Sequence, residues 1–443
     1  MAQTTAPPPP LPGTDAAPAF SPAYRRYVLI VLTTVYVANF VDRQILSILL
    51  QPIKESFGLS DTQLGFLSGI SFAIFYATLG IPIAMWADRG NRRNIITLAT
   101  GIFSIMTAVC GLAQSFVQLA LARIGVGIGE AGASPPSHSI LADLYPPEQR
   151  ATAMGIFALG VNIGILIGFL VGGWMNEFFG WRVAFMVVGV PGLLLALLVR
   201  LTVREPARGH SEGRGQEAAS APPPVAETAR RFWACRSLRH ISLGAALNAF
   251  VGYGVVAWMP AYLIRSFGMS TGDVGTALAL IIGIVGGAGT FLGGYFADRL
   301  ARRDVRWNMW LIAACIAGGA PFAFAVYLAP TATWALFSFV VPAAVGTIYL
   351  GPSLALVQGL VPLRMRTVSS AVLLFVINII GLGFGPQMVG VVSDLLAPRF
   401  ADESLRYALL IVGFVNLWSA LHFLLASRTL KQDLAALQQD PTN

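Results

Sequence analysis

Long runs of apolar residues, separated by short polar stretches, dominate this sequence. A helix that crosses the hydrocarbon core of a bilayer needs about 20 mostly apolar residues. We predict that each run of this kind forms a membrane-spanning helix. The twelve runs cover residues 27–49, 62–87, 94–114, 116–144, 151–175, 182–203, 240–264, 273–297, 306–328, 331–361, 367–396 and 404–426.

The composition agrees with this pattern. Of the 443 residues, 56% are hydrophobic and only 11% are charged, whereas a soluble domain carries about 25% charged residues. The three cysteines, Cys110, Cys235 and Cys315, are too few and too scattered for a disulfide framework or a zinc site. We therefore expect an all-α polytopic membrane protein, monomeric, with no metal and no cofactor.

Two polar segments divide the chain. Residues 1–23 and 204–238 are rich in Pro, Ala, Gly and Glu, so we expect both to be disordered and exposed to water. The second segment separates six predicted spans from six. This predicts an N-terminal bundle over 24–203, a C-terminal bundle over 239–426 and a tail over 427–443.

The basic residues lie mostly on one side of the predicted helices. With both termini inside, 22 of the 29 Lys and Arg fall in cytoplasmic segments, 5 fall in outside loops and 2 fall within spans. This is the bias expected of a membrane protein, and it accounts for the net charge of +8 without a nucleic-acid partner. No Asn-x-Ser/Thr sequon occurs, which favours a bacterial inner membrane.

An internal repeat relates the two halves. The sequence SFG at 56–58 recurs at 266–268, and DRxxRR at 88–93 recurs at 298–303, both at an offset of 210. Two six-helix units of parallel orientation therefore descend from one ancestral unit. Transporter folds are commonly built in this way, with a site near mid-membrane between the repeats.

The repeated loops resemble a known signature. The sequence AMWADRGNRR at 84–93 resembles the signature of the major facilitator superfamily, and 294–303 resembles its second copy. Within that superfamily, NFVDR at 39–43 and RIGVGIGEA at 123–131 resemble the spinster type. The resemblance implies a transporter of twelve helices in two pseudo-symmetric bundles, which exports sphingosine phosphate or lysophospholipids.

The two DRxxRR loops are predicted to act as cytoplasmic latches. Each aspartate follows a span that runs inward, so its carboxylate can meet the positive N-terminus of a helix or a neighbouring arginine. Topogenic charge alone is the alternative explanation. The residues concerned are Asp88, Arg89, Arg92, Arg93, Asp298, Arg299, Arg302 and Arg303.

Four charged residues fall deep within the predicted spans: Asp42 and Arg43 in the first, and Arg123 and Glu130 in the fourth. A charge at mid-bilayer costs at least about 2.5–3.5 kcal/mol, so these four need partners or water. Depth along the helices puts Arg43 level with Glu130, and Asp42 within reach of Arg123. The repeat-related positions in the second half are Gly252 and Tyr253, at the offset of 210, and Phe339 and Gly346, at the offset of 216 that relates PS at 136–137 to PS at 352–353.

We hypothesise that Asp42 and Glu130 exchange protons while Arg43 and Arg123 hold an anionic headgroup. A carboxylate that loses its arginine partner in a dry site binds a proton more readily, and arginine grips phosphate or carboxylate bidentately. A structural ion-pair network is the alternative. The further candidate substrate-binding residues are Tyr36, Asn39, Ser134, Asn162, Asn248, Tyr253 and Asn378, although an Asn within a span equally serves contact between helices.

A stripe of glycines runs along the fifth predicted span, at Gly160, Gly164, Gly168 and Gly172. Small residues at four-residue steps allow two membrane helices to approach closely. We interpret the stripe as close packing. In the superfamily this region resembles a glycine motif of exporters, but Phe169 stands where that motif has proline, so transport direction stays open.

These observations predict a secondary active transporter that works by alternating access, is coupled to protons and moves an amphipathic lysolipid or sphingoid-type anion. The alternatives are a transporter of a small water-soluble organic anion, sugar or drug, and a membrane receptor that does not transport. No His-Glu-x-x-His and no Cys-x-x-Cys occurs, and the glycine-rich run 125–132 has no lysine after it. An enzyme is therefore not expected.

Overall fold

The computed structural model describes residues 20–208, 225–362 and 365–439, and within these ranges every regular element is a helix. Residues 20–208, here the N-half, form α1 (Pro22–Phe57), α2 (Asp61–Ser68), α3 (Ile70–Arg89), α4 (Arg92–Leu112), α5 (Phe116–Glu130), α6 (Ser134–Leu144), α7 (Pro147–Phe179) and α8 (Trp181–Thr202). Residues 225–439, here the C-half, form α9 (Val225–Ala234), α10 (Arg236–Phe267), α11 (Thr271–Leu278), η2 (Ala279–Val285), α12 (Gly286–Ala301), α13 (Trp307–Leu328), α14 (Ala332–Val345), α15 (Leu350–Gly359), α16 (Arg366–Val376), η4 (Ile377–Phe384), α17 (Gly385–Phe400), η5 (Ala401–Glu403), α18 (Ser404–Gly413) and α19 (Val415–Gln438).

The predicted apolar runs coincide with these helices. Among the described residues, 11 helical segments are long and apolar enough to cross a membrane, and the last of them, Arg366–Leu437, has 72 residues. One crossing needs about 20 residues, so this last segment is long enough for two. The helices extend beyond the apolar runs; α1, for example, runs from Pro22 to Phe57, where the apolar run predicts 27–49.

Local sequence explains where the helices begin and end. The Ser21 hydroxyl caps α1 by accepting from the Tyr24 amide at 3.2 Å, and Pro22 occupies the first turn, where its missing N–H costs nothing. At the other end, Gly58 has a φ of 65°, which is the left-handed conformation that glycine adopts freely at a helix C-terminus.

Six predicted spans contain an irregular segment. In the N-half, the helix is interrupted at Gly69 between α2 and α3, and at residues 131–133 between α5 and α6. In the C-half, the π-helices η2 and η4 interrupt two further segments, and turns at 346–349 and at Phe414 separate α14 from α15 and α18 from α19. Irregular backbone at membrane depth is tolerated where protein or a water-filled cavity covers it, and π-helical turns are frequent at functional sites.

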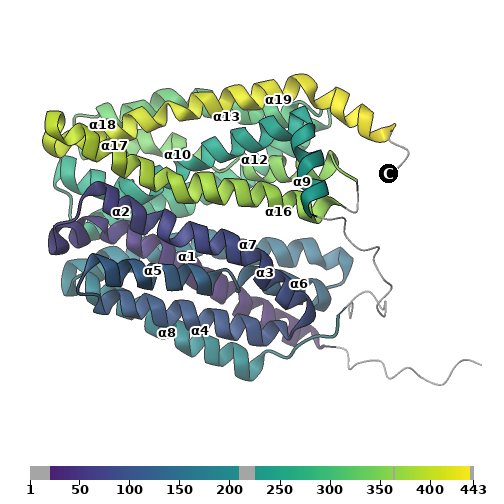
Figure 1. Ribbon diagram of the computed structural model, residues 1–443, viewed down its shortest axis with the longest axis horizontal. Helices are drawn as coiled ribbons and strands as arrows, with labels where there is room; N and C mark the ends of the chain where they lie inside the picture. Colours follow the sequence, from purple (N-terminus) through teal and green to yellow (C-terminus); the bar gives the residue numbers. More distant parts are fainter. Residues whose placement is uncertain (1–19, 209–224, 363–364, 440–443) are drawn as a thin grey trace, which may run out of the picture.

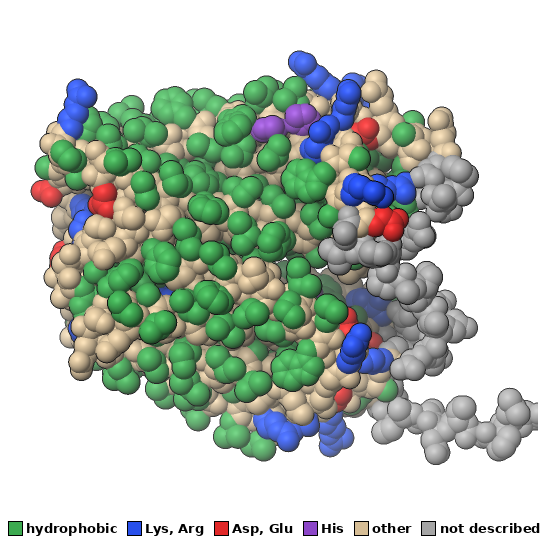
Figure 2. Space-filling model, in the orientation of Figure 1, with side chains coloured by type: hydrophobic (Ala, Val, Ile, Leu, Met, Phe, Trp, Pro, Cys, Tyr) green, Lys and Arg blue, Asp and Glu red, His purple; other side chains and the backbone are tan. Residues whose placement is uncertain are grey.

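The two halves lie side by side, with α1–α8 in the lower part of Figure 1 and α9–α19 in the upper part. We call the end at which α1 begins and α19 ends the terminal end, and the opposite end the distal end. At the terminal end, the surface is hollowed between the two halves (Figure 2). At the distal end the two halves make close contact. A Cβ added to Gly65 of α2 would lie only 2.8 Å from the Pro386 carbonyl oxygen of α17.

Apolar side chains cover the middle of the surface, and charged side chains gather towards its two ends (Figure 2). Large apolar side chains are widely exposed, including Phe291 at 76%, Leu395 at 74% and Leu201 at 73%. Soluble monomers rarely expose contiguous apolar surface on this scale. The molecule is therefore built to be surrounded by lipid, as an integral membrane protein.

The glycine stripe of α7 packs against α1, which confirms its interpretation as a close helix contact. A Cβ on Gly164 would lie 2.5 Å from the Phe40 Cβ, and one on Gly172 would lie 2.7 Å from a methyl of Ile48. Only glycine lets the two helices approach this closely.

The prediction of disorder across 204–238 is wrong for its last part. Residues 225–234 form helix α9, in which Phe232 is fully buried in the C-half core. The strong segregation of apolar and polar side chains on this short helix explains the difference, because its apolar face packs onto α10 and α16. The chain between 209 and 224, and residues 1–19, lie outside the described residues. The predicted tail is also helical up to Gln438, as part of α19.

Candidate functional site

The first buried ion pair joins α1 to α5. Arg123 donates from Nη1 to Asp42 Oδ2 at 2.9 Å, and the two side chains are 2% and 1% exposed. The second carboxylate oxygen of Asp42 accepts a hydrogen bond from the Thr107 hydroxyl of α4. The carboxylate is thus held by three helices of the N-half.

The second buried pair lies beside the first. Arg43 donates from Nε to Glu130 Oε2 at 2.7 Å; Glu130 is fully buried and Arg43 is 12% exposed. Glu130 is the last residue of α5, where the helix stops before the turn at 131–133. Both pairings are those that helix depth predicts from the sequence. The functional roles of the four side chains remain predictions.

Aromatic rings surround the Arg43 guanidinium. Its Cζ lies 4.9 Å from the ring centroids of Phe40 and Phe72 and 4.7 Å from that of Tyr76. Phe72 also lies beneath Arg123, at 5.5 Å. Cation–π contacts of this kind stabilise a guanidinium that has been removed from water, so the rings supply part of the solvation that burial takes away.

Some polar atoms of this site have no hydrogen-bond partner among the described residues. They are Arg123 Nε, Glu130 Oε1 and Asn39 Oδ1. Buried polar atoms are normally paired, so a donor and two acceptors remain available for water, a proton or a ligand. We call Asp42, Arg43, Arg123 and Glu130 the central ionic cluster.

Several other predicted residues lie around this cluster. Tyr36 stacks on Phe157 with ring centroids 4.5 Å apart, and Tyr253 of the C-half comes close enough to Arg43 to interact with its charge. Ser134, at the start of α6, has its hydroxyl 3.4 Å from His138 Nδ1. Asn39 is 2% exposed.

Two of the remaining predicted asparagines lie at helix contacts. Asn248 donates to the Gly346 carbonyl at 2.9 Å, which connects α10 to the break between α14 and α15. Asn162 of α7 lies against Gly287 of α12, and Asn378 lies in the π-helix η4. For Asn248 the structure therefore favours helix contact, which was one of the two interpretations the sequence left open.

The two DRxxRR loops differ from each other. Arg92 is buried and donates to Asp143 of α6, to Glu205 at 2.6 Å and to the Pro206 carbonyl at 2.8 Å. Its counterpart Arg302 is exposed, because the position that matches Asp143 is Gly359 and supplies no carboxylate. The residues Asp88, Arg89, Asp298, Arg299 and Arg303 are also exposed, whereas Arg93 is half-buried.

The predicted latch of Asp88 and Asp298 is not engaged in this conformation. Within the described part of the chain, neither carboxylate accepts a hydrogen bond from a helix N-terminus or from an arginine.

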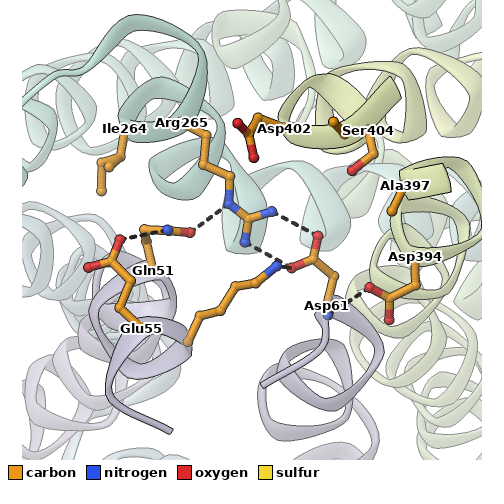
Figure 3. Close-up of a pocket in the computed structure, with 11 residues that line it drawn as sticks. Gln51, Glu55, Asp61, Ile264, Arg265, Asp394, Ala397, Asp402 and Ser404 are labelled. Carbon is orange, nitrogen blue, oxygen red and sulfur yellow. Dashed lines mark hydrogen bonds and ion pairs between the residues drawn. The ribbon is translucent and has the colours of Figure 1, made fainter. Parts of the chain in front are cut away.

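A second ionic cluster lies at the distal end and was missed from the sequence. Arg265 of α10 donates from Nη1 and Nη2 to the two carboxylate oxygens of Asp61, each at 2.8 Å, and Lys54 donates to the same carboxylate at 2.6 Å (Figure 3). Asp394 of α17 accepts from the Asp61 and Thr62 amides at 3.0 and 2.7 Å. We call Lys54, Asp61, Arg265 and Asp394 the distal ionic cluster.

This cluster lines a cavity of about 510 Å³ between the halves. Lys54 and Arg265 lie beyond the apolar runs 27–49 and 240–264 that predict the first and seventh spans, but the helices continue past these runs, and both residues belong to the last turns of α1 and α10. The repeated SFG sequence indicates where these two helices end, because glycine commonly follows the last residue of a helix. In the structure Gly58 and Gly268 both have this place and adopt positive φ.

Sequence comparison identifies the class of protein that this architecture belongs to. The model of the Major Facilitator Superfamily matches residues 32–386. The chain therefore belongs to this superfamily of membrane transporters.

Three similar proteins show which members of the superfamily this chain resembles. The chain is 34% identical over 425 residues to an MFS-type efflux pump of Mycolicibacterium smegmatis, covering 95% of this chain and 97% of that protein. It is 27% identical over 460 residues to protein spinster homolog 1 of Mus musculus, covering 95% and 84%. A solved structure of a bacterial homolog to the human lysosomal transporter spinster, inward-facing and unoccupied, matches with a TM-score of 0.86 at 36% identity, covering 94% of this chain and 99% of that one.

Proposed function

We propose that this protein is a proton-coupled secondary transporter that moves an amphipathic lysolipid or sphingoid-type anion by alternating access. The observation that carries the proposal is the central ionic cluster, in which two fully buried carboxylates are each paired with an arginine. Intramembrane ionisable residues of this kind mark substrate and proton pathways. The similarity to spinster proteins supports a lipid-like substrate.

The coupling follows from competition for the arginines. An anionic headgroup that binds Arg43 and Arg123 takes them away from Glu130 and Asp42. Each carboxylate, left without its partner in a site with little water, then binds a proton. The free Arg123 Nε supplies one donor to the anion before any pair is broken.

The C-half has no charge at the matching positions. Phe339, which matches Arg123, is 5% exposed within the apolar core. We propose that the headgroup binds to the N-half and that the acyl tail lies against the C-half. A small organic anion, sugar or drug has no acyl tail and would need no apolar surface on the C-half.

The topology belongs to the same proposal. We propose twelve crossings in two pseudo-symmetric six-helix bundles over 24–203 and 239–426, with 204–238 as a cytoplasmic linker. Both termini are then cytoplasmic in a bacterial inner membrane, which follows from the excess of Lys and Arg on that side. The hollow at the terminal end (Figure 2) then opens to the cytoplasm, and the state described is inward-facing.

The test is transport of a fluorescent lysophosphatidic acid by the purified protein in proteoliposomes, with and without a pH gradient. Asp42→Asn is expected to abolish uphill transport while the exposed control Glu148→Gln retains it. If Asp42→Asn still drives uphill, pH-dependent transport at the wild-type rate, Asp42 is not the coupling residue. If benzoate or a sugar is moved in place of the lysolipid, the substrate assignment is wrong.

A further inference from the structure

Thr107 lies between Asp42 and the backbone of its own helix. The residue is on α4 and only 1% exposed. Its hydroxyl lies within hydrogen-bonding distance of two oxygens: Oδ1 of Asp42 and, at 2.8 Å, the Phe103 carbonyl one turn earlier. The other carboxylate oxygen of Asp42 is held by Arg123.

A threonine hydroxyl has one proton and two lone pairs, so it donates to only one of these oxygens at a time. An ionised carboxylate only accepts, so with Asp42 ionised the Thr107 proton points to Asp42. A neutral carboxyl group carries its own O–H. It then donates to the Thr107 oxygen, and the Thr107 proton turns to the Phe103 carbonyl.

We propose that Thr107 is a positioning residue for proton coupling, whose hydroxyl keeps the Asp42 carboxyl hydrogen-bonded in both its ionised and its neutral form. The inference rests on the proposed role of Asp42. A buried polar group that loses its partner is strongly destabilised, so a carboxyl without such a neighbour would favour one charge state. With Thr107 present, protonation of Asp42 at Oδ1 requires only that the Thr107 hydroxyl rotates towards the Phe103 carbonyl.

The groups around Asp42 do not offer the same exchange. Arg123, which faces it from α5, can only donate. Cys110, one turn after Thr107 on α4, is a weak donor and is also fully buried. Glu130 interacts with Asp42 through its charge and is itself paired with Arg43. Thr107 is therefore the side chain in this set that both donates and accepts strongly.

The experiment measures the pH at which the two halves change their separation. Spin labels on cysteines introduced at the exposed positions Glu148 and Gly359 report the distance across the terminal end, in a background where Cys235 and Cys315 are replaced by serine. Thr107→Val removes the hydroxyl at nearly constant volume, Thr107→Ala does so without the branch, and Thr107→Ser keeps it. The control is Thr100→Val, because Thr100 is fully buried on the same helix and its hydroxyl has no partner within the described residues.

Hydrogen bonds to a charged group are about twice as strong as neutral ones. Removing the hydroxyl therefore weakens the ionised form more than the neutral form, and Thr107→Val is expected to move the midpoint of the transition up by about one pH unit. Thr107→Ala is expected to move it in the same direction, whereas Thr107→Ser and Thr100→Val keep the wild-type midpoint. Added to Asp42→Asn, Thr107→Val is expected to cause no further shift.

Two results would overturn different parts of this argument. If Asp42→Asn changes the pH response but Thr107→Val and Thr107→Ala leave the midpoint unchanged, the inference about Thr107 is wrong and the proposed function stands. If Asp42→Asn itself leaves the pH response unchanged, the proposed proton coupling is wrong as well. An equal shift in Thr107→Ser and Thr107→Val would show that packing, and not the hydroxyl, sets the midpoint.

Discussion

Arg265 holds both carboxylate oxygens of Asp61, each at 2.8 Å, and so connects α10 of the C-half directly to α2 of the N-half. Asp61 is 2% exposed and also accepts from Lys54 and from the Ser393 hydroxyl. Bidentate arginine–carboxylate pairs are the stronger class of charge-assisted bond. The distal end is therefore closed by specific polar contacts as well as by close backbone packing.

Asp61→Asn is expected to favour opening of the distal end. The change leaves Arg265 and Lys54 without their anion, which weakens the closed state by about 2 kcal/mol, or about thirtyfold in the population ratio. Distances between spin labels at the exposed positions Phe179 and Arg399 measure this ratio. Glu55→Gln, an exposed residue at the same cavity, is the control, and an unchanged distance distribution in Asp61→Asn would exclude a role in closure.

Arg43→Lys is expected to weaken binding of an anionic lysolipid although the positive charge is kept. A lysine ammonium loses the planar fork and the stacking among Phe40, Phe72 and Tyr76, so we expect about tenfold weaker binding of lysophosphatidic acid. Quenching of tryptophan fluorescence in the purified protein measures the affinity.

Arg182→Lys is the matched control for this change. Arg182 also lies over two aromatic rings, at 4.1 Å from Trp181 and 5.6 Å from Phe57, but it lies at the start of α8, away from the central ionic cluster. An equal loss of lysophosphatidic acid affinity in the two variants would mean that stacking stabilises the protein and does not contribute to substrate binding.

The contact between α1 and α7 predicts opposite effects for two glycines on one helix. In Gly164→Ala the new Cβ would lie 2.5 Å from the Phe40 Cβ and 2.7 Å from the Val37 carbonyl oxygen, and overpacking of this kind costs about 1–3 kcal/mol. In Gly155→Ala the Cβ meets nothing within 4 Å, so the helix gains about 0.5–1 kcal/mol. Thermal unfolding in detergent should show a lower Tm for the first variant and an equal or higher Tm for the second.

The helices and the central ionic cluster were predictable because both depend on short-range rules. Apolar run length sets the spans, and the rise per residue sets the depth at which Arg43 meets Glu130. The distal ionic cluster was not predictable in this way. Its contacts join residues of different halves, such as Asp61 of the N-half and Asp394 of the C-half, and they depend on how the two halves pack against each other.

The positions of the helix breaks could also be predicted from the sequence only in part. In the fourth span the break at 131–133 lies directly before Pro135 and Pro136 in the first turn of α6, and prolines inside an apolar run are a local signal of such a break. Nothing in the local sequence indicates the π-helices η2 and η4, which pack against α7 and against α3 and α10, respectively. The apolar pattern is the same for an α-helix and a π-helix over one turn, so the choice is made by tertiary packing.

Arg92 and Arg302, which occupy the same place in the two DRxxRR loops, are expected to differ in their effect on stability. Arg92→Gln breaks ion pairs with Asp143 and Glu205 and leaves the Pro206 carbonyl without its donor, which costs about 2 kcal/mol or more. Arg302→Gln removes an exposed side chain, for which changes stay within about 0.5 kcal/mol. Thermal unfolding of the two purified variants measures the difference, and a similar Tm for both would show that the buried pairs of Arg92 do not hold the first loop in place.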